Sequence, residues 1–287
     1  MMICAEKLGF AYQSPVVPRR RVLSDITFTI GENELVAIVG ATGSGKTTLI
    51  EHLNGLQQPT FGHIRVGGLD LADHRTDLNL IRRRVGLVFQ FPENQFFEET
   101  VSEEVGFGIR NTGLTADAAS RKIRESLESV GLDAARYGPL SPFHVSGGEK
   151  RRVAIASVLV MDPEVLILDE PTVGLDREGA RHVAAVIRDY HRMGRTVIFV
   201  SHDMDMVAGL ARRIIALSAG RLVFDGETSR FFRDRRVCEA CGLRLPSVVA
   251  YMRRIQKAGY AVNTGVLTLE AAREEICRVK QAGSHSA

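Results

Sequence analysis

An apolar run that leads directly into a glycine-rich loop and a lysine constrains this chain more than any other feature. Residues Leu35–Val39 are all apolar. The nine residues that follow are Gly40, Ala41, Thr42, Gly43, Ser44, Gly45, Lys46, Thr47 and Thr48. They fit Gly-x-x-x-x-Gly-Lys-[Ser/Thr], whose backbone N–H groups cradle phosphate oxygens. In that motif the lysine reaches the β- and γ-phosphates and the hydroxyl binds Mg²⁺. We therefore predict a strand, a phosphate-binding loop and a helix over 47–54, in an α/β fold.

Two other interpretations of this loop fail. A plain glycine turn does not explain why a strand pattern, a Lys-Thr pair and a helix pattern all agree around it. A dinucleotide-binding fingerprint is excluded, because Thr48 stands where its third glycine would be. The helix N-terminus after the loop adds a favourable potential for an anion.

A second apolar run ends in two carboxylates. Val165–Leu168 is expected to be a strand of a parallel sheet that is covered on both faces. Asp169 follows and is expected to hold Mg²⁺, directly or through water. Glu170, one residue further on, can polarise the water that attacks the γ-phosphate.

Two more polar residues follow predicted strands. Gln90 comes after the strand pattern of residues 85–89, and His202 comes after Thr196–Val200. Ligands of open α/β sheets bind at the carboxyl ends of the strands. We therefore expect Gln90 to meet Mg²⁺ or the attacking water through its amide, and His202 to contact the γ-phosphate and orient the water.

Composition and charge limit the number of domains and the kinds of partner that this chain can have. The chain has 287 residues, of which 45% are hydrophobic, so one large or two modest domains with a sizeable core are possible. The formal net charge is only +3. The basic runs Arg19–Arg21 and Arg82–Arg84 are therefore interpreted as solvated arginines, and we expect no nucleic-acid partner. No apolar stretch of membrane-spanning length and no apolar signal core occur, which predicts a cytosolic chain.

The predicted secondary-structure pattern changes twice along the chain. After strands within residues 3–38, the region of about 91–160 is mostly helical in pattern, and 116–130 is its clearest helix. Residues 226–287 contain two short amphipathic helices, one over 247–257 and one after the N-cap Thr268. The second helix is expected to place these residues on one side: Leu269, Ala272, Ile276 and Val279. So small a tail makes a poor independent core, so it is expected to pack on the main body or on a partner.

The pair Cys238-x-x-Cys241 allows a zinc or redox interpretation. A structural zinc site needs two more ligands, and only Cys277 and His285 follow. Reduced thiols are the default in a cytosolic chain.

The most specific element is Val145-Ser146-Gly147-Gly148-Glu149. With it, the chain resembles an ATP-binding-cassette (ABC) ATPase over residues 3–225, because the phosphate loop, Gln90, Ser-Gly-Gly, Asp169-Glu170, Gly174-Leu-Asp176 and His202 follow the order of that family. The resemblance implies a RecA-like core, an N-terminal antiparallel β subdomain, a helical signature subdomain, and ATP and Mg²⁺ as ligands.

The resemblance also assigns roles across a dimer. Ser146, Gly147 and Gly148 would open a helix and touch the γ-phosphate of ATP bound to the opposite subunit, which suits a hydroxyl donor, two glycines and a helix N-terminus. Asp176 would link the two sites. Tyr12 matches the residue that stacks on adenine, although a half-buried strand tyrosine is the alternative. Glu149 replaces the usual glutamine, and we expect its carboxylate to turn aside from the nucleotide.

Residues 89–101, Phe-Gln-Phe-Pro-Glu-Asn-Gln-Phe-Phe-Glu-Glu-Thr-Val, narrow the resemblance. Together with the tail from Leu243 to Ile276, they are similar to the ATPases of energy-coupling-factor (ECF) transporters, which import vitamins and transition-metal ions. This implies a peripheral protein at the cytoplasmic face of the membrane, paired with a second, related ATPase as a heterodimer. It also implies a membrane coupling subunit and a substrate-binding membrane subunit. Residues 226–287 would be a dimerisation extension.

Glu93 is the expected contact for arginines of the coupling subunit, because it lies nearest Gln90 in an acidic segment. A solvated acidic helix is the alternative.

The sequence motifs bear on three other functions. The ATPase of a conventional ABC importer fits the same motifs. A soluble ABC protein that acts on ribosomes or DNA usually has two cassettes in one chain or long coiled-coil insertions, and neither occurs here. A P-loop kinase leaves Val145–Glu149 and Gly174–Asp176 without an explanation.

Overall fold

The computed structural model describes residues 2–12 and 20–284. The chain forms two compact units, Met1–Glu34 with Thr47–Val200 and Leu35–Lys46 with Ser201–Ala287. The sequence-based boundary near residue 225 stays a prediction. Arg19 and His285 lie outside the described residues. No helix in the described part of the chain is long and apolar enough to cross a membrane.

The first unit begins with a four-stranded antiparallel sheet. Its strands, in spatial order, are β2 (Arg20–Ile30), β1 (Ile3–Tyr12), β4 (Phe61–Val66) and β5 (Leu69–Asp70). Ile3 of the central strand lies opposite Ile30 on one side and Val66 on the other. All three side chains are fully buried, which explains why apolar residues recur along these strands. The predicted N-terminal β subdomain is confirmed.

Three parallel strands form the buried centre of the same unit. They are β6 (Val85–Val88), β7 (Val165–Asp169) and β8 (Thr196–Val200). Every residue of β7 and β8 is buried, in agreement with their apolar runs Val165–Leu168 and Val197–Val200. The helix α7 (Arg177–Arg192) lies between them in sequence. It begins at Arg177, because the Asp176 carboxylate accepts the Gly179 N–H at 2.7 Å and caps it.

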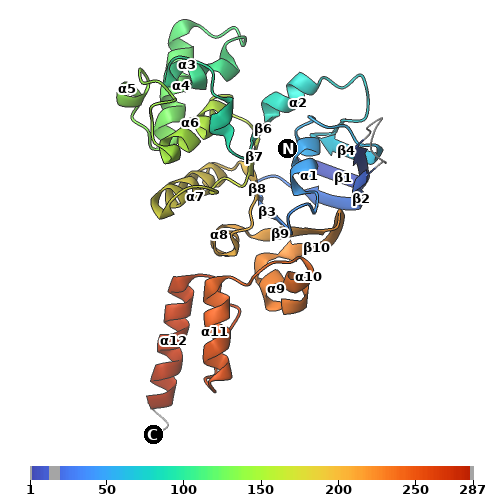
Figure 1. Ribbon diagram of the computed structural model, residues 1–287, viewed down its shortest axis with the longest axis vertical. Helices are drawn as coiled ribbons and strands as arrows, with labels where there is room; N and C mark the ends of the chain where they lie inside the picture. The colour runs from blue at the N-terminus through green and yellow to red at the C-terminus, as the bar shows by residue number, and fades with distance from the viewer. Residues whose placement is uncertain (1, 13–19, 285–287) are drawn as a thin grey trace. The chain divides into compact units, whose positions relative to one another are not determined.

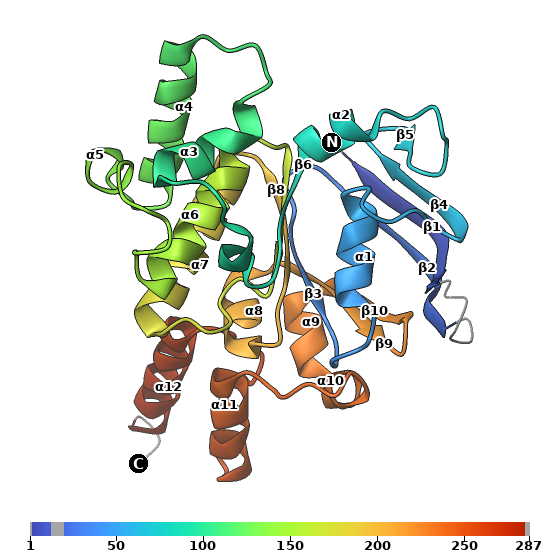
Figure 2. The same cartoon turned by 45° about the horizontal axis from the view of Figure 1, so that its top comes forward.

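The first unit also contains most of the helices that precede β7. Their bounds are α1 (Lys46–Leu53), α2 (Leu78–Arg84), η1 (Pro92–Gln95), α3 (Val101–Gly106), η2 (Phe107–Ile109), α4 (Ala116–Ser129), α5 (Ala134–Tyr137) and α6 (Gly147–Leu159). Both views show α3, α4, α5 and α6 gathered together (Figures 1 and 2). The predicted helical region of about 91–160 and its clearest helix are therefore present.

The second unit contains the strand that precedes the phosphate loop. Here β3 (Leu35–Val39) runs parallel to β9 (Arg213–Ser218), which forms an antiparallel hairpin with β10 (Arg221–Glu227). All residues of β3 are buried. The helix α8 (Met204–Leu210) is capped by Asp203, whose carboxylate accepts the N–H groups of Asp205 and Met206.

The tail has four helices over the residues that the structure describes, up to 284, which is two more than the sequence predicts. They are α9 (Thr228–Arg233), α10 (Arg235–Ala240), α11 (Ser247–Lys257) and α12 (Leu269–Ser284). The first two have six residues each, too short for a periodic pattern to stand out. Side by side in Figure 1, α11 and α12 enclose a small apolar cluster of Val248, Met252, Val262 and Ala272.

The last helix differs in one residue from its predicted apolar face. Ile276 and Val279 pack against the cluster, and Thr268 caps the helix through the Ala271 N–H. Leu269 is 74% exposed instead of packed, because it lies in the first turn, outside the cluster.

Candidate functional site

The phosphate loop has a backbone that requires its glycines. Gly40, Gly43 and Gly45 all have positive φ values, 149°, 79° and 100°. A Cβ atom on Gly40 would lie 2.2 Å from the Leu217 carbonyl oxygen, so no other residue fits there. Nothing lies within 4 Å of a Cβ built on Gly43, so the outer side of the loop is open. The Lys46 ammonium donates to the carbonyl oxygens of Gly40 and Ala41, at 2.8 and 3.1 Å, and so lies over the loop.

The first unit brings together a hydroxyl and a carboxylate suited to Mg²⁺. The Thr47 hydroxyl at the start of α1 donates to Asp169 Oδ2 at 2.9 Å, and Asp169 at the end of β7 is only 2% exposed. Hard oxygen donors of this kind are the ligands that Mg²⁺ prefers. Glu51, which the sequence analysis missed, lies on the same helix. Its burial, and then the charge of Asp169, raise the pKa of the Glu51 carboxyl above its usual value.

Glu170 has a strained backbone. Its φ of 47° lies in the left-handed region, which costs a residue with a Cβ atom about 1–2 kcal/mol. Its N–H donates to the Val200 carbonyl oxygen at 3.0 Å, which ties it to the end of β8. Strain at this position is typical of functional residues held by the surrounding structure.

Tyr12 is placed beside the helix that follows the loop. Its hydroxyl and that of Thr48 are 3.4 Å apart, and its ring packs edge-on against Phe10 with centroids 4.8 Å apart. The side chain is 46% exposed, so it is not a core tyrosine. An exposed ring at this place suits the stacking role that the sequence predicts.

The Ser-Gly-Gly element opens α6 as predicted. Ser146 is the N-cap, and the Glu149 carboxylate returns to it by accepting the Ser146 N–H at 2.7 Å. The other oxygen of Glu149 accepts the Tyr137 hydroxyl at 2.6 Å. First this bond, and then the bonds to Ser146, lower the pKa of the Glu149 carboxyl. The carboxylate is thus held at the helix cap, and Glu149 also lines the hollow described next, so its orientation toward a bound nucleotide stays a prediction.

Two helix N-termini meet at one hollow. A hollow of about 440 Å³ is lined around the start of α6 by Ser146, Gly147 and Gly148, and just before α7 by Gly174 and Asp176. Charged and titratable residues line it as well: Glu149, Arg152, Glu178 and His182. No atom lies within 4 Å of a Cβ built on Gly147, so the backbone can be approached closely. Backbone N–H groups at two helix starts make this hollow suited to an anion.

Gln90 and His202 are exposed side chains at strand ends. Gln90 follows β6 in the first unit, and His202 belongs to the second unit, two residues before α8. Their roles at the nucleotide stay predictions.

Glu93 has an internal partner that the sequence analysis missed. Its carboxylate oxygens accept from Arg151 Nε and Nη2 at 3.2 and 3.3 Å. Arg151 is 1% exposed, whereas the Glu93 side chain is 21% exposed. The acidic residue predicted to meet a partner therefore also neutralises a buried arginine.

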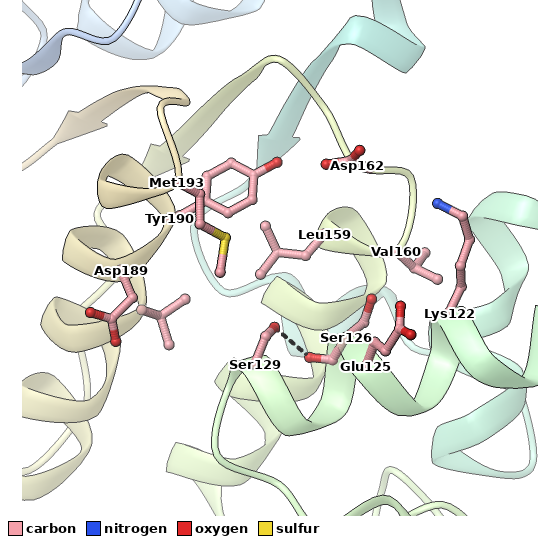
Figure 3. A pocket seen from close by; sticks show the side chains of 11 residues that line it. Lys122, Glu125, Ser126, Ser129, Leu159, Val160, Asp162, Asp189, Tyr190 and Met193 are labelled. Atoms are coloured by element: carbon pink, nitrogen blue, oxygen red, sulfur yellow. Dashed lines mark hydrogen bonds between the residues drawn. The ribbon is translucent and has the colours of Figure 1, made fainter.

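A second hollow, of about 290 Å³, contains none of the predicted site residues (Figure 3). It lies between α4, α7 and the end of α6, and the Tyr190 hydroxyl beside it donates to the Pro163 carbonyl oxygen at 2.6 Å.

The cysteine pair forms part of a buried region. Cys238 and Cys241 are each 1% exposed, and Cys238 Sγ donates to the Phe231 carbonyl oxygen at 3.5 Å. Burial raises the pKa of Cys238 to about 11, so its thiol stays protonated at neutral pH. In the part of the chain that the structure describes, no group of three or more His, Cys, Asp or Glu side chains is placed to hold a metal ion.

Comparison with known proteins identifies the class first. The family model for ABC transporters matches residues 23–173, more than half of the chain. A solved ABC structure, the dimeric ATP-binding cassette MJ0796 bound to ADP and phosphate, is 27% identical with a TM-score of 0.71. The match covers 79% of this chain and 98% of that one. The fold and the site thus define an ABC ATPase cassette.

Two further relatives define the family. The energy-coupling factor transporter ATP-binding protein EcfA2 of Clostridium perfringens is 42% identical over 97% of this chain and 98% of its own. The structure of cbiO1 from the same organism, part of the ABC transporter complex cbiONQ, has a TM-score of 0.76 and is 31% identical. That match covers 90% of this chain and 98% of cbiO1. The chain belongs to the energy-coupling factor transporter ATP-binding proteins, within the ABC transporter family.

Proposed function

We propose that this chain is the ATP-hydrolysing subunit of an ECF-type importer, which powers uptake of a vitamin or a transition-metal ion through a membrane coupling subunit. The observation that carries the proposal is the hollow at the starts of α6 and α7, where Ser146, Gly147 and Asp176 face an open space. An anion-binding surface of this kind, next to the chain's own signature element, suits nucleotide held by a second ATPase subunit.

The chain's own nucleotide binds at the phosphate loop. Backbone N–H groups from Gly40 to Thr48 hold the phosphates, the Lys46 ammonium contacts the β- and γ-phosphates, and the Tyr12 ring stacks on adenine. Thr47, Asp169 and Gln90 are the proposed holders of Mg²⁺. The bound ion would offset negative charge on the phosphate oxygens.

Hydrolysis needs a positioned water molecule. The Glu170 carboxylate orients that water and polarises it, and His202 and Gln90 contact the γ-phosphate and the water. Ser146 and the N-terminus of α6 do the same electrostatic work for the partner's ATP, because fixed N–H and O–H dipoles there favour the charge on its γ-phosphate. ATP therefore binds the closed pair through extra contacts and shifts the equilibrium toward closure.

The segment after Gln90 is the proposed docking surface for the coupling subunit. It exposes Phe91, Phe97 and Phe107, and Phe97 and Phe107 pack edge-on with centroids 4.8 Å apart. Exposed aromatic rings beside the exposed Glu99 suit a partner that offers apolar and arginine side chains. We keep Glu93 in this surface, at its inner edge.

The tail is the proposed contact with the second ATPase. A largely apolar hollow of about 600 Å³ lies along α11 and α12 and is lined by Val248, Tyr251, Leu269 and Ile276, among others. Tyr251 and Leu269 are 57% and 74% exposed. Exposed apolar groups of this size mark interaction sites in soluble proteins. A related, non-identical ATPase is the proposed partner.

The test is the mass of the intact membrane complex that copurifies with this chain. The proposal predicts a membrane-associated complex at the cytoplasmic face, with one copy of this chain, one related ATPase, a coupling subunit and a small substrate-binding membrane subunit. Two copies of this chain with a soluble substrate-binding protein would instead identify a conventional importer.

A further inference from the structure

Arg151 is the largest fully buried side chain of the described residues, and it lies on α6, five residues after Ser146. A buried guanidinium requires partners for its donors, since an unpaired buried charge is strongly unfavourable. Arg151 meets this requirement with two groups of partners, one before it and one after it in the sequence.

The first group belongs to the segment that follows Gln90. Both Glu93 oxygens accept from Arg151, at 3.2 and 3.3 Å. The guanidinium carbon also lies 5.8 Å from the centre of the Phe91 ring. Phe91, with φ of 51°, turns the chain directly after Gln90. The start of this segment is therefore fixed to α6.

The second group belongs to the turn that carries Glu170. Arg151 Nη1 donates to the carbonyl oxygens of Glu170 and Pro171 at 3.3 and 3.2 Å, and Nη2 donates to that of Val173 at 3.2 Å. The strained Glu170 backbone is thus held from both ends, by the Val200 carbonyl at its N–H and by Arg151 at its carbonyl.

We propose that Arg151 is a positioning residue for hydrolysis: its guanidinium holds the Glu170 turn in the conformation that aims the carboxylate at the water, and it fixes that turn to the segment after Gln90. The inference rests on the proposed role of Glu170. It deepens that role, because Glu93 and Arg151 connect the segment after Gln90 to the backbone of Glu170. A shift of that segment therefore reaches Glu170.

A lysine cannot replace Arg151 in this place. The guanidinium offers five N–H donors in a fixed plane, and here it serves two carboxylate oxygens and three carbonyls. An ammonium is a single point with three donors, so Arg151→Lys keeps the charge and loses most of these bonds.

The experiment measures ATP hydrolysis by the purified complex containing Arg151→Lys. We expect kcat to fall about tenfold or more, because a small displacement of a catalytic group has effects of this size, while KM for ATP stays within about twofold. A purely structural arginine would lower the melting temperature and leave kcat of the folded complex unchanged. The matched control is Arg84→Lys, which breaks the two-bond pair of Arg84 with Glu164 and should leave kcat unchanged.

Glu93→Gln gives a second variant in case Arg151→Lys does not fold. It keeps the shape of Glu93 and removes its charge, and we expect kcat to fall about threefold or more with KM unchanged. Wild-type kcat in the folded Arg151→Lys complex, or in Glu93→Gln where the lysine variant is unfolded, overturns the inference. A raised KM with unchanged kcat overturns it as well.

Glu170→Gln, measured beside these variants, separates this inference from the proposed function. If Glu170→Gln is inactive and Arg151→Lys is not impaired, only the inference is wrong. If Glu170→Gln hydrolyses ATP at the wild-type rate, the proposed role of Glu170 is wrong, and the inference is overturned with it.

Discussion

Ser146→Ala should separate the two roles of the serine hydroxyl, as a helix cap and as a ligand of the partner's nucleotide. An N-cap Ser→Ala change usually costs about 1 kcal/mol. Here the bond from the Glu149 N–H to Ser146 Oγ is long, 3.4 Å, and the stronger bond, from the Ser146 N–H to Glu149 at 2.7 Å, survives in alanine. We therefore expect a loss of about 0.5 kcal/mol, which lowers the melting temperature by only about 1 °C.

The effect on catalysis should be much larger and should appear in the other subunit. Removing one preorganised donor from a site of developing charge typically lowers the rate by about 10²-fold or more. The Ser146 hydroxyl lines the hollow at the starts of α6 and α7. In the sequence, Ser146 is far from this chain's own phosphate loop. ATP held at the partner's phosphate loop should therefore be hydrolysed at least about tenfold more slowly.

A photoreactive ATP analogue, trapped in the purified complex, reports which subunit retains nucleotide. We expect Ser146→Ala to change labelling of the partner and to leave labelling of this chain as in the wild type. Thr115→Ala is the control, because Thr115 caps α4 through a similar bond of 3.3 Å to the Ala118 N–H. Loss of nucleotide from this chain's own loop, with the partner unaffected, would refute the reasoning.

Two further predictions concern pH and docking. Burial lowers the pKa of His52 below the 6.5 of an ordinary histidine, so the unfolded imidazole takes up a proton first. The contribution of His52 to the free energy of unfolding should thus be fully present above pH 6.5 and be lost as the pH falls below it. Urea titrations of His52→Leu should therefore show a flatter pH dependence in this range, and an unchanged slope would exclude His52 as its source. Phe97→Asp should weaken capture of the coupling subunit about tenfold and leave ATP affinity within about twofold, because Phe97 is 60% exposed. Unchanged assembly would show that Phe97 is not part of the docking surface. Glu93→Lys tests the same surface less cleanly, because it also places a cation against buried Arg151.

Short sequence patterns predicted the parts of the fold that depend only on residues near one another in the sequence. The glycines of the phosphate loop, the apolar β7 and β8, and the cap residue Thr268 each follow from backbone conformation, burial on both faces or a single hydrogen bond. The family resemblance placed Ser146 at a helix start, and the structure shows a capping box there between Ser146 and Glu149.

Long-range partners could not be predicted in this way. Arg151 stands in the sequence Lys150-Arg151-Arg152, which has the composition of a solvated basic face, and only the tertiary structure shows that it is buried among carbonyl groups. The same holds for Glu93, since the guanidinium of its partner Arg151 lies 58 residues away in sequence. Tyr137, which bonds Glu149, has no sequence signal at all.

The most direct test of the central claim is ATP turnover by the intact complex in which this chain carries Glu170→Gln. The side chain keeps its size, and the bond from its backbone N–H to Val200 is unaffected, so folding and ATP affinity should match the wild type. Loss of the carboxylate should lower turnover at this chain's site by about 10²-fold or more. Full hydrolysis at that site, with Glu170→Gln confirmed in the complex, would contradict the account.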